Sequence, residues 1–174
     1  MKKWILLMGV IMLLTGCKKD DFDINNPNVE KFVQQLKNGT YNEYERNENG
    51  ARLWLQMPRF RQEHIAALIE LSKDTTHIQK FPTSPISSRS PLPEDRNYFI
   101  LGECLLWTVD GIRGASSLDP YLIDTSKEQE ERFKGITATE ILMLSDRYRQ
   151  WWNENKNGDW KTNSALTGTS YKWM

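Results

Sequence analysis

The stretch between residues 93 and 114 constrains the fold most, because the helix it predicts is apolar around almost its whole circumference. Its polar side chains Arg96, Glu103 and Asp110 recur every seven residues and form one narrow line. A helix with so little polar surface has no broad side that can face water. We therefore expect it at the centre of the molecule, covered by other helices.

Two more helices are predicted on the N-terminal side of this segment. Between residues 26 and 38, apolar side chains recur at i, i+3, i+4 and i+7 from Val29, an Asn-Pro pair opens the pattern, and Asn38 with Gly39 supplies a left-handed end. A second apolar stripe predicts a helix over residues 59–73.

Two helices are also predicted on the C-terminal side. Residues 127–133 form a short charged pattern. Thr137 and Glu140 match a capping box, in which each side chain accepts a hydrogen bond from the other residue's backbone amide. The capping box predicts a long helix from there to Asn157 and Gly158.

No stretch shows the polar and apolar alternation of a strand over a useful length, so we expect an all-α fold. Residues 40–58 are expected to form a loop with a short helical turn, and residues 81–93, which contain four prolines, a loop. Four or five helices arranged as antiparallel hairpins would form a compact bundle or a short HEAT-like stack. No self-similar repeat distinguishes these two arrangements.

The N-terminus has the pattern of a lipoprotein signal peptide. Lys2 and Lys3 precede an apolar run over residues 4–14, which is too short to span a bilayer. The Leu-Thr-Gly-Cys sequence that follows resembles the lipobox and implies cleavage before Cys17 and acylation of that residue. We expect a signal peptide over residues 1–16, a lipidated tether over 17–26 and a single helical domain over 27–174.

The charged residues after Cys17 bear on location and on partners. Residues 18–23 resemble the export signal of surface lipoproteins in Bacteroides-type bacteria, which implies an outer-membrane location and an exposed face; an ordinary polar tether is the alternative. The predicted leader holds two of the 23 basic and none of the 23 acidic residues, so the remaining chain has a net charge of −2. Because acids and bases alternate along it, we expect no nucleic-acid partner.

Catalytic candidates are few. The sequence contains no HExxH, GxSxG, CxxC or phosphate-binding loop, and we expect no metal and no cofactor. His64 with Glu63, and Glu103 with Asp110, would form an acid and base cluster if their predicted helices pack together. The alternative is a buried hydrogen-bond network.

Candidate binding residues lie in two places, and one further residue is a candidate for modification. Trp151 and Trp152 diverge by about 100° on a helix, so only one can be deeply buried, and the other would be free to stack on a sugar or anchor a protein. Phe81 and Arg89 lie in the proline-rich loop. Thr75, in an Asp-Thr-Thr sequence, resembles an acceptor for O-linked glycosylation; a helix-ending turn is the alternative.

The stretches HIAALIELSKDTTHIQKFPTSPISSR and LGECLLWTVDGIR are the most distinctive parts of the chain. They resemble a family of small Bacteroides-type (Bacteroidota) lipoproteins, a domain of unknown function. The matching positions are Asp74, Thr75, Thr76, Phe81, Pro82, Pro85, Ile86, Ser87, Ser88, Leu106, Trp107, Arg113, Tyr148, Trp151 and Trp152. The resemblance implies location and fold, and no activity.

Two functions follow as expectations. The first is a noncatalytic lipoprotein that binds or scaffolds an envelope protein or glycan. The alternative is an envelope hydrolase of cell-wall or polysaccharide material that uses His64, Glu103 or Asp110. A deep pocket with converging carboxylates would favour the hydrolase, and a shallow aromatic groove would favour binding.

Overall fold

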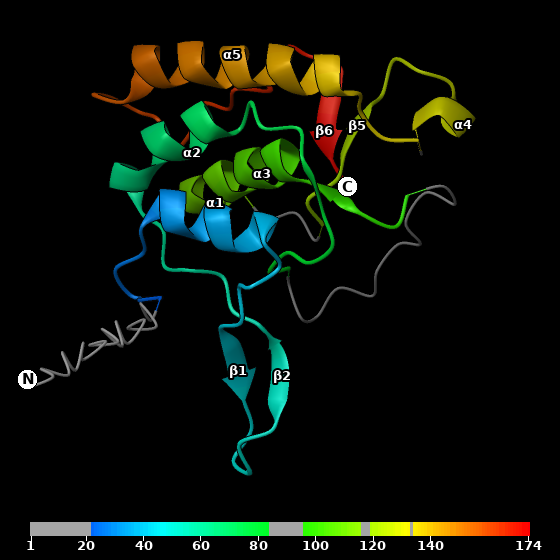
Figure 1. Cartoon of the computed structure of the whole chain (residues 1–174). Helices are drawn as coiled ribbons and strands as arrows, with labels where there is room; N and C mark the ends of the chain where they lie inside the picture. The colour runs from blue at the N-terminus through cyan, green and yellow to red at the C-terminus, as the bar shows by residue number, and fades with distance from the viewer. Residues whose placement is uncertain (1–21, 84–95, 116–118, 133) are drawn as a thin grey trace, which may run out of the picture.

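The computed structural model describes residues 22–83, 96–115, 119–132 and 134–174. Four helices form its centre: α1 (Val29–Lys37), α2 (Ile65–Leu71), α3 (Leu101–Arg113) and α5 (Ala138–Asn155). In Figure 1, α5 runs across the top, α2 and α3 lie beneath it, and α1 lies below them. A 3-10 turn, η1 (Gln62–His64), precedes α2, and the single-turn helix α4 (Gln129–Arg132) lies at one edge.

Helix α3 is the central helix, as its apolar sequence predicts. Both α2 and α5 pack against it, and Leu101, Leu105, Leu106 and Val109 are fully buried. It begins at Leu101 rather than near residue 93, so the predicted start was wrong. The N-terminus of α3 is tied to the turn after α2, because its first two amides donate to carbonyl oxygens of Thr76 and Asp74 at 3.0 and 2.8 Å.

The first predicted helix is confirmed as α1. Its four apolar positions, which begin at Val29, are all buried. Asn28 accepts a hydrogen bond from the amide of Lys31 at 2.7 Å, so the N-cap is two residues later than the Asn-Pro pair indicated. Gly39 follows with a φ of +65°, the left-handed conformation expected there.

The capping box of α5 is also confirmed. The hydroxyl of Thr137 accepts from the amide of Glu140 at 3.2 Å, and the carboxylate of Glu140 accepts from the amide of Thr137 at 2.7 Å. The helix then continues for 18 residues to Asn155. The predicted helix over 59–73 is shorter in the structure, as η1 followed by α2.

The expectation of an all-α fold is wrong. The described residues contain six strands in three antiparallel two-stranded sheets, so the fold is mixed α/β and neither a plain helical bundle nor a HEAT-like stack. The pairs are β1 (Tyr44–Arg46) with β2 (Arg52–Leu55), β3 (His77–Ile78) with β4 (Phe99–Ile100), and β5 (Leu122–Asp124) with β6 (Tyr171–Trp173). Strands of two to four residues are too short for alternation to be visible in the sequence.

The β1–β2 hairpin replaces the loop and helical turn expected over residues 40–58. Its turn is built on Asn47, whose side-chain oxygen accepts from the amides of Asn49 and Ala51 at 3.1 and 2.9 Å. Gly50 completes the turn with a φ of +76°. The hairpin projects from the lower side of the body, away from α5 (Figure 1).

Candidate functional site

Glu103, one of the three predicted catalytic candidates, lies in a buried ion pair. Its Oε2 pairs with Arg96, and its Oε1 accepts from the amide of Leu122 at 2.7 Å. The Arg96 guanidinium lies over the rings of Tyr121 and Tyr98, at 4.9 and 5.5 Å. Burial raises the pKa of Glu103, and the charge of Arg96 opposes that rise. The two carboxylate oxygens therefore connect α3 to the segment before β4, through Arg96, and to β5, through Leu122.

Asp110 is buried in a second internal network. Its Oδ2 accepts from the Tyr148 hydroxyl at 2.6 Å and from the Trp173 indole at 2.7 Å, and its Oδ1 accepts from Arg113 at 3.1 Å. Burial and the neighbouring Asp110 charge hold the pKa of Tyr148 well above its usual value. The network connects α3, α5 and β6, which is the buried hydrogen-bond arrangement named above as the alternative to catalysis.

The structure does not assemble the predicted acid and base cluster. His64 is half-buried at the start of α2, where its Nδ1 accepts from the amide of Arg61 at 3.0 Å and its ring meets Phe60 edge-on at 5.4 Å. No hydrogen bond between described residues joins it to Glu103 or Asp110. These two carboxylates are two helical turns apart, about 10 Å along the axis.

Two of the predicted binding aromatics are largely buried. Trp151 is 6% exposed and donates its indole N–H to the carbonyl of Asn163 at 2.9 Å. Phe81 is 4% exposed and packs against Phe32. Trp152 is half-buried and meets Trp160 edge-on, so it is the more accessible of the adjacent pair.

Thr75 is half-buried in the turn after α2. Its neighbour Asp74 accepts from Lys37 at 2.6 Å and from the amide of Thr76 at 2.9 Å. Burial by itself raises the pKa of Asp74, but these hydrogen bonds lower it overall. The turn is thus the expected helix-ending structure, and modification of Thr75 stays a prediction. Cys17 and Arg89 lie outside the described residues.

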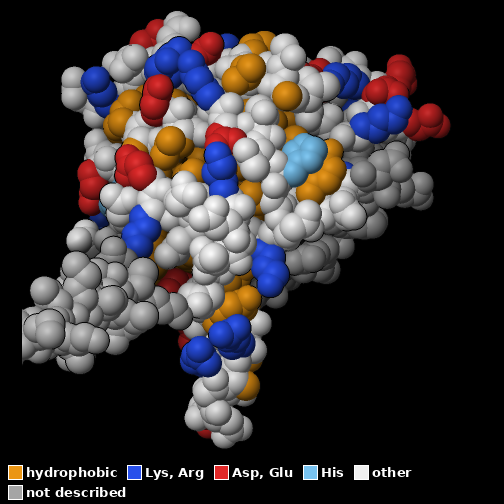
Figure 2. All heavy atoms as spheres, viewed as in Figure 1, with side chains coloured by type: hydrophobic (Ala, Val, Ile, Leu, Met, Phe, Trp, Pro, Cys, Tyr) orange, Lys and Arg blue, Asp and Glu red, His pale blue; other side chains and the backbone are white. Residues whose placement is uncertain are grey.

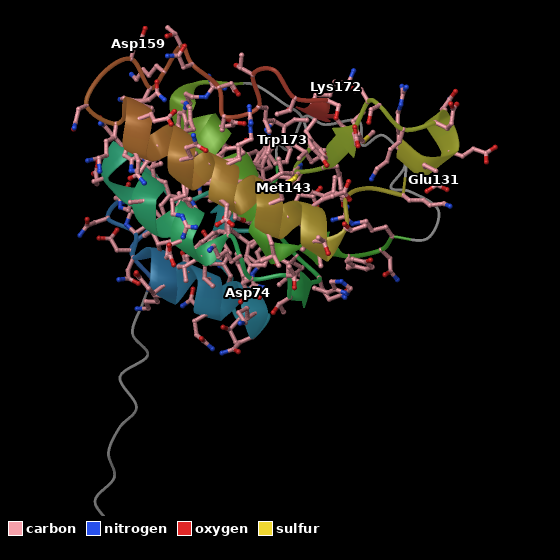
Figure 3. All side chains as sticks on the ribbon, turned by 90° about the horizontal axis from the view of Figure 1, so that it is seen from above. Asp74, Glu131, Met143, Asp159, Lys172 and Trp173 are labelled. Carbon is pink, nitrogen blue, oxygen red and sulfur yellow. The ribbon has the colours of Figure 1, made fainter. Side chains whose placement is uncertain are left out.

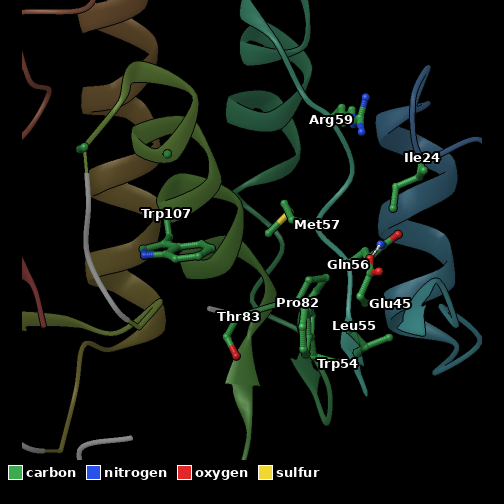
Figure 4. A pocket seen from close by; sticks show the side chains of 12 residues that line it. Ile24, Glu45, Trp54, Leu55, Gln56, Met57, Arg59, Pro82, Thr83 and Trp107 are labelled. Atoms are coloured by element: carbon green, nitrogen blue, oxygen red, sulfur yellow. Dashed lines mark hydrogen bonds between the residues drawn. The ribbon is translucent and has the colours of Figure 1, made fainter. Parts of the chain in front are cut away.

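A feature that sequence analysis missed is an open groove of about 470 Å³ beside the β1–β2 hairpin (Figure 4). We call it the hairpin groove. It lies between the hairpin, the segment that follows it, and the outer side of α3. The lining side chains that matter here are Glu45, Trp54, Gln56, Arg59, Thr83 and Trp107. The Asn-Glu-Asn-Gly turn signal could have revealed the hairpin, but nothing local reveals the groove.

Trp54 is the most accessible aromatic of the hairpin groove. It lies on β2 and is 42% exposed, whereas Trp107 on α3 is half-buried. Glu45 and Gln56 are hydrogen-bonded across the hairpin, as the dashed line in Figure 4 shows. Arg59 is exposed and its charge balances that of Glu45. The groove thus combines indole surface with planar polar groups and has no net charge on its described lining.

Two other open hollows are lined by described residues. One of about 290 Å³ lies between α5 and residues 163–167 and is lined in part by Trp151, and one of about 670 Å³ is lined by residues 128–131, which include no aromatic side chain. Figure 2 shows acidic and basic side chains scattered over the visible face, without a field of one sign. Met143 lies on α5, as the view from above in Figure 3 shows. Helix α5 and the β1–β2 hairpin are at opposite ends of the body in Figure 1, so Met143 is far from the hairpin. Among the described residues, no group of three or more His, Cys, Asp or Glu could hold a metal ion.

The described helices include none long and apolar enough to cross a membrane. No curated protein and no solved structure matches the chain significantly. Residues 23–174 match a family from end to end of the described body, and the chain therefore belongs to the family described as a domain of unknown function, DUF4943.

Proposed function

We propose that this protein is a noncatalytic binding lipoprotein of the outer membrane in Bacteroides-type bacteria, anchored through Cys17. Its ligand, an envelope glycan or protein, would bind in the hairpin groove. The observation that carries this proposal is Trp54. Its indole is 42% exposed and lines the groove, where it can stack on a ligand.

The form of the groove also supports binding. It is open and aromatic, and its lining brings a single described carboxylate, Glu45, next to an amide. A hydrolase of glycosidic bonds needs two carboxyl groups that face one scissile bond. The hydrolase alternative has less support, because Glu103 and Asp110 accept hydrogen bonds inside the body and lie outside the groove.

The attachment point of the tether supports a position close to the membrane. Phe22 is buried against Tyr41, with ring centroids 5.5 Å apart, and the carbonyl of Ile24 accepts from the amide of Arg59 at 2.9 Å. Five residues of extended chain span at most about 18 Å between Cys17 and Phe22. Because Ile24 also lines the groove, the groove would lie close to the lipid anchor.

Photo-crosslinking in cells tests the proposal. A benzophenone amino acid replaces Thr83, which lines the groove, and in a control replaces Met143 on α5, which is exposed and remote. We expect an envelope adduct, glycan or protein, from position 83 and not from position 143. Absence of an adduct at position 83, or equal adducts at both positions, would contradict the proposal.

A further inference from the structure

We infer that the ligand of the hairpin groove is a neutral carbohydrate chain, with one sugar ring stacked on Trp54. This inference rests on the proposed function, because it uses the same groove. It specifies the ligand class, which the proposed function leaves as glycan or protein.

The first argument is the combination of surfaces in the groove. A pyranose ring has a flat face of C–H groups, which packs well against an indole, and a rim of hydroxyls, which must be hydrogen-bonded when they leave water. Trp54 and Trp107 supply indole surface from β2 and α3. Gln56, Glu45 and Arg59 supply planar donors and acceptors along the same groove.

The second argument is charge. Hydroxyls both donate and accept, so they fit a lining in which an amide, a carboxylate and a guanidinium occur together. Arg59 is the one described cation of the lining, and Glu45 balances it. The described lining therefore has no net positive charge to attract a polyanion, and a neutral chain needs none.

The third argument is the small amount of exposed apolar surface. Within the described ranges, the large exposed apolar side chains are Leu53, Trp54, Leu142 and Met143. Leu142 and Met143 belong to α5, on the side opposite the hairpin, and Leu53 does not line the groove. One exposed indole is enough to hold a sugar ring, but a stable protein interface buries about 800 Å² per partner around several apolar anchors.

The test compares Trp54→Ala with Leu53→Ala. These neighbours lie on the same strand and are similarly exposed, at 42% and 47%, but only Trp54 lines the groove. The full chain in detergent is applied to an array of bacterial, host and plant oligosaccharides. The saccharide that binds best is then titrated by NMR, with the indole N–H signal of Trp54 as the local reporter.

We expect a neutral oligosaccharide to bind and to shift the Trp54 indole signal. Trp54→Ala should weaken binding about tenfold or more, and Leu53→Ala by less than about twofold, with thermal midpoints close to that of the wild type. Glu45→Ala, which removes a hydrogen-bonding group and leaves the indole in place, should weaken binding by a smaller factor than Trp54→Ala.

Three results would overturn the inference: no saccharide binding, equal losses in the two hairpin variants, or a preference for charged polysaccharides. The crosslinking experiment separates this failure from that of the proposed function. An adduct of a single protein at position 83 with no saccharide binding would leave the groove as a binding site and remove carbohydrate as its ligand. If neither an adduct at position 83 nor saccharide binding is found, both the proposed function and the carbohydrate ligand are ruled out.

Discussion

At the scale of single residues, the three polar side chains that recur every seven residues between positions 93 and 114 link parts of the fold. Arg96, Glu103 and Asp110 are all buried, and each contacts a different part of the chain. The guanidinium of the Arg96–Glu103 pair lies over the ring of Tyr121, and its Nε and Nη1 atoms have no hydrogen-bond partner among the described residues. Such a pair fixes which segments meet, and its contribution to stability depends on both charges being present.

We therefore predict a strongly non-additive mutant cycle at this pair. Glu103→Leu should lower the free energy of unfolding by about 3–5 kcal/mol, because it leaves a buried, unpaired guanidinium. The double variant Arg96→Met with Glu103→Leu should recover most of that loss, since both desolvated charges are gone. Urea unfolding of the wild type, the single variants and the double variant measures the coupling. Additive losses would contradict the prediction.

At the scale of elements, the junction of α2 with α3 depends on a glycine. A Cβ at Gly102 would overlap the carbonyl oxygen of Ser72 and lie 2.9 Å from Cγ2 of Ile141 on α5. The close approach lets Ser72 and Ser145 share a buried hydrogen bond at 2.8 Å. Three helices therefore meet where only a hydrogen atom fits.

Gly102→Ala and Gly111→Ala should change stability in opposite directions. Both glycines lie in α3, but no described atom lies within 4 Å of a Cβ built at Gly111. Alanine at position 111 should stabilise the protein by about 0.5–1 kcal/mol through lower backbone entropy in the unfolded chain. Alanine at position 102 should destabilise it by about 1–3 kcal/mol through overpacking. Thermal unfolding of both variants checks the signs; a neutral Gly102→Ala would show that the junction can yield.

The start of α5 carries a pH-dependent contribution. Glu140 caps the helix and also accepts from Lys127 at 2.6 Å and from the Tyr171 hydroxyl at 3.1 Å. Burial raises the pKa of Glu140, but the hydrogen bonds from Lys127 and Thr137 and the charge of Lys127 outweigh that effect and lower the pKa overall. Burial and the Glu140 charge in turn raise the pKa of Tyr171 to about 12.

Glu140→Gln should therefore cost stability at neutral pH and not at low pH. Glutamine keeps the capping hydrogen bond but loses the charge, and we expect a loss of about 0.5–1 kcal/mol at pH 7. A depressed folded pKa stabilises the protein above the unfolded value and loses this effect as pH falls through the folded value. In urea titrations at several pH values, the difference between the two proteins should shrink as pH falls below the unfolded value of about 4.3 and vanish only below the lowered folded pKa. A constant difference would assign the effect to packing.

At the scale of the whole molecule, the end of the chain closes the body. β6 pairs with β5, the amide of Met174 donates to the carbonyl of Tyr121 at 2.9 Å, and Trp173 reaches Asp110. The loop between α5 and β6 is held by Arg147 of α5, which donates hydrogen bonds to the carbonyls of Ala165 and Thr167 at 2.6 and 2.7 Å. The beginning of the described body is fixed at Phe22, so the proposed tether pulls on a folded core.

The two cysteines provide a matched test of the lipid anchor. Cys104 is fully buried, and burial raises its pKa well above the usual value, so its thiol is a poor nucleophile. We expect radiolabelled palmitate to enter the wild type and the Cys104→Ser variant and not the Cys17→Ser variant, which should leave the membrane fraction. Labelling of the Cys17→Ser variant, or none of the wild type, would refute the anchor.

The sequence by itself determined the features whose signals are local. The apolar stripe from Val29 gives α1, the Thr137 and Glu140 capping box gives the start of α5, and the nearly uniform apolar circumference of α3 makes it central. Each signal lies within one or two helical turns, so no distant contact is needed to recognise it.

Only the tertiary structure decided the three sheets and the groove. β5 and β6 pair across a long stretch of sequence, and strands of three residues have no pattern that identifies their partner. Glu103 and Asp110 are buried hydrogen-bond acceptors rather than catalytic groups because of residues distant in the sequence. Leu122 donates to Glu103, and Tyr148 and Trp173 donate to Asp110. The accessibility of Trp54 likewise depends on the hairpin leaving the body, and no neighbouring residue encodes that.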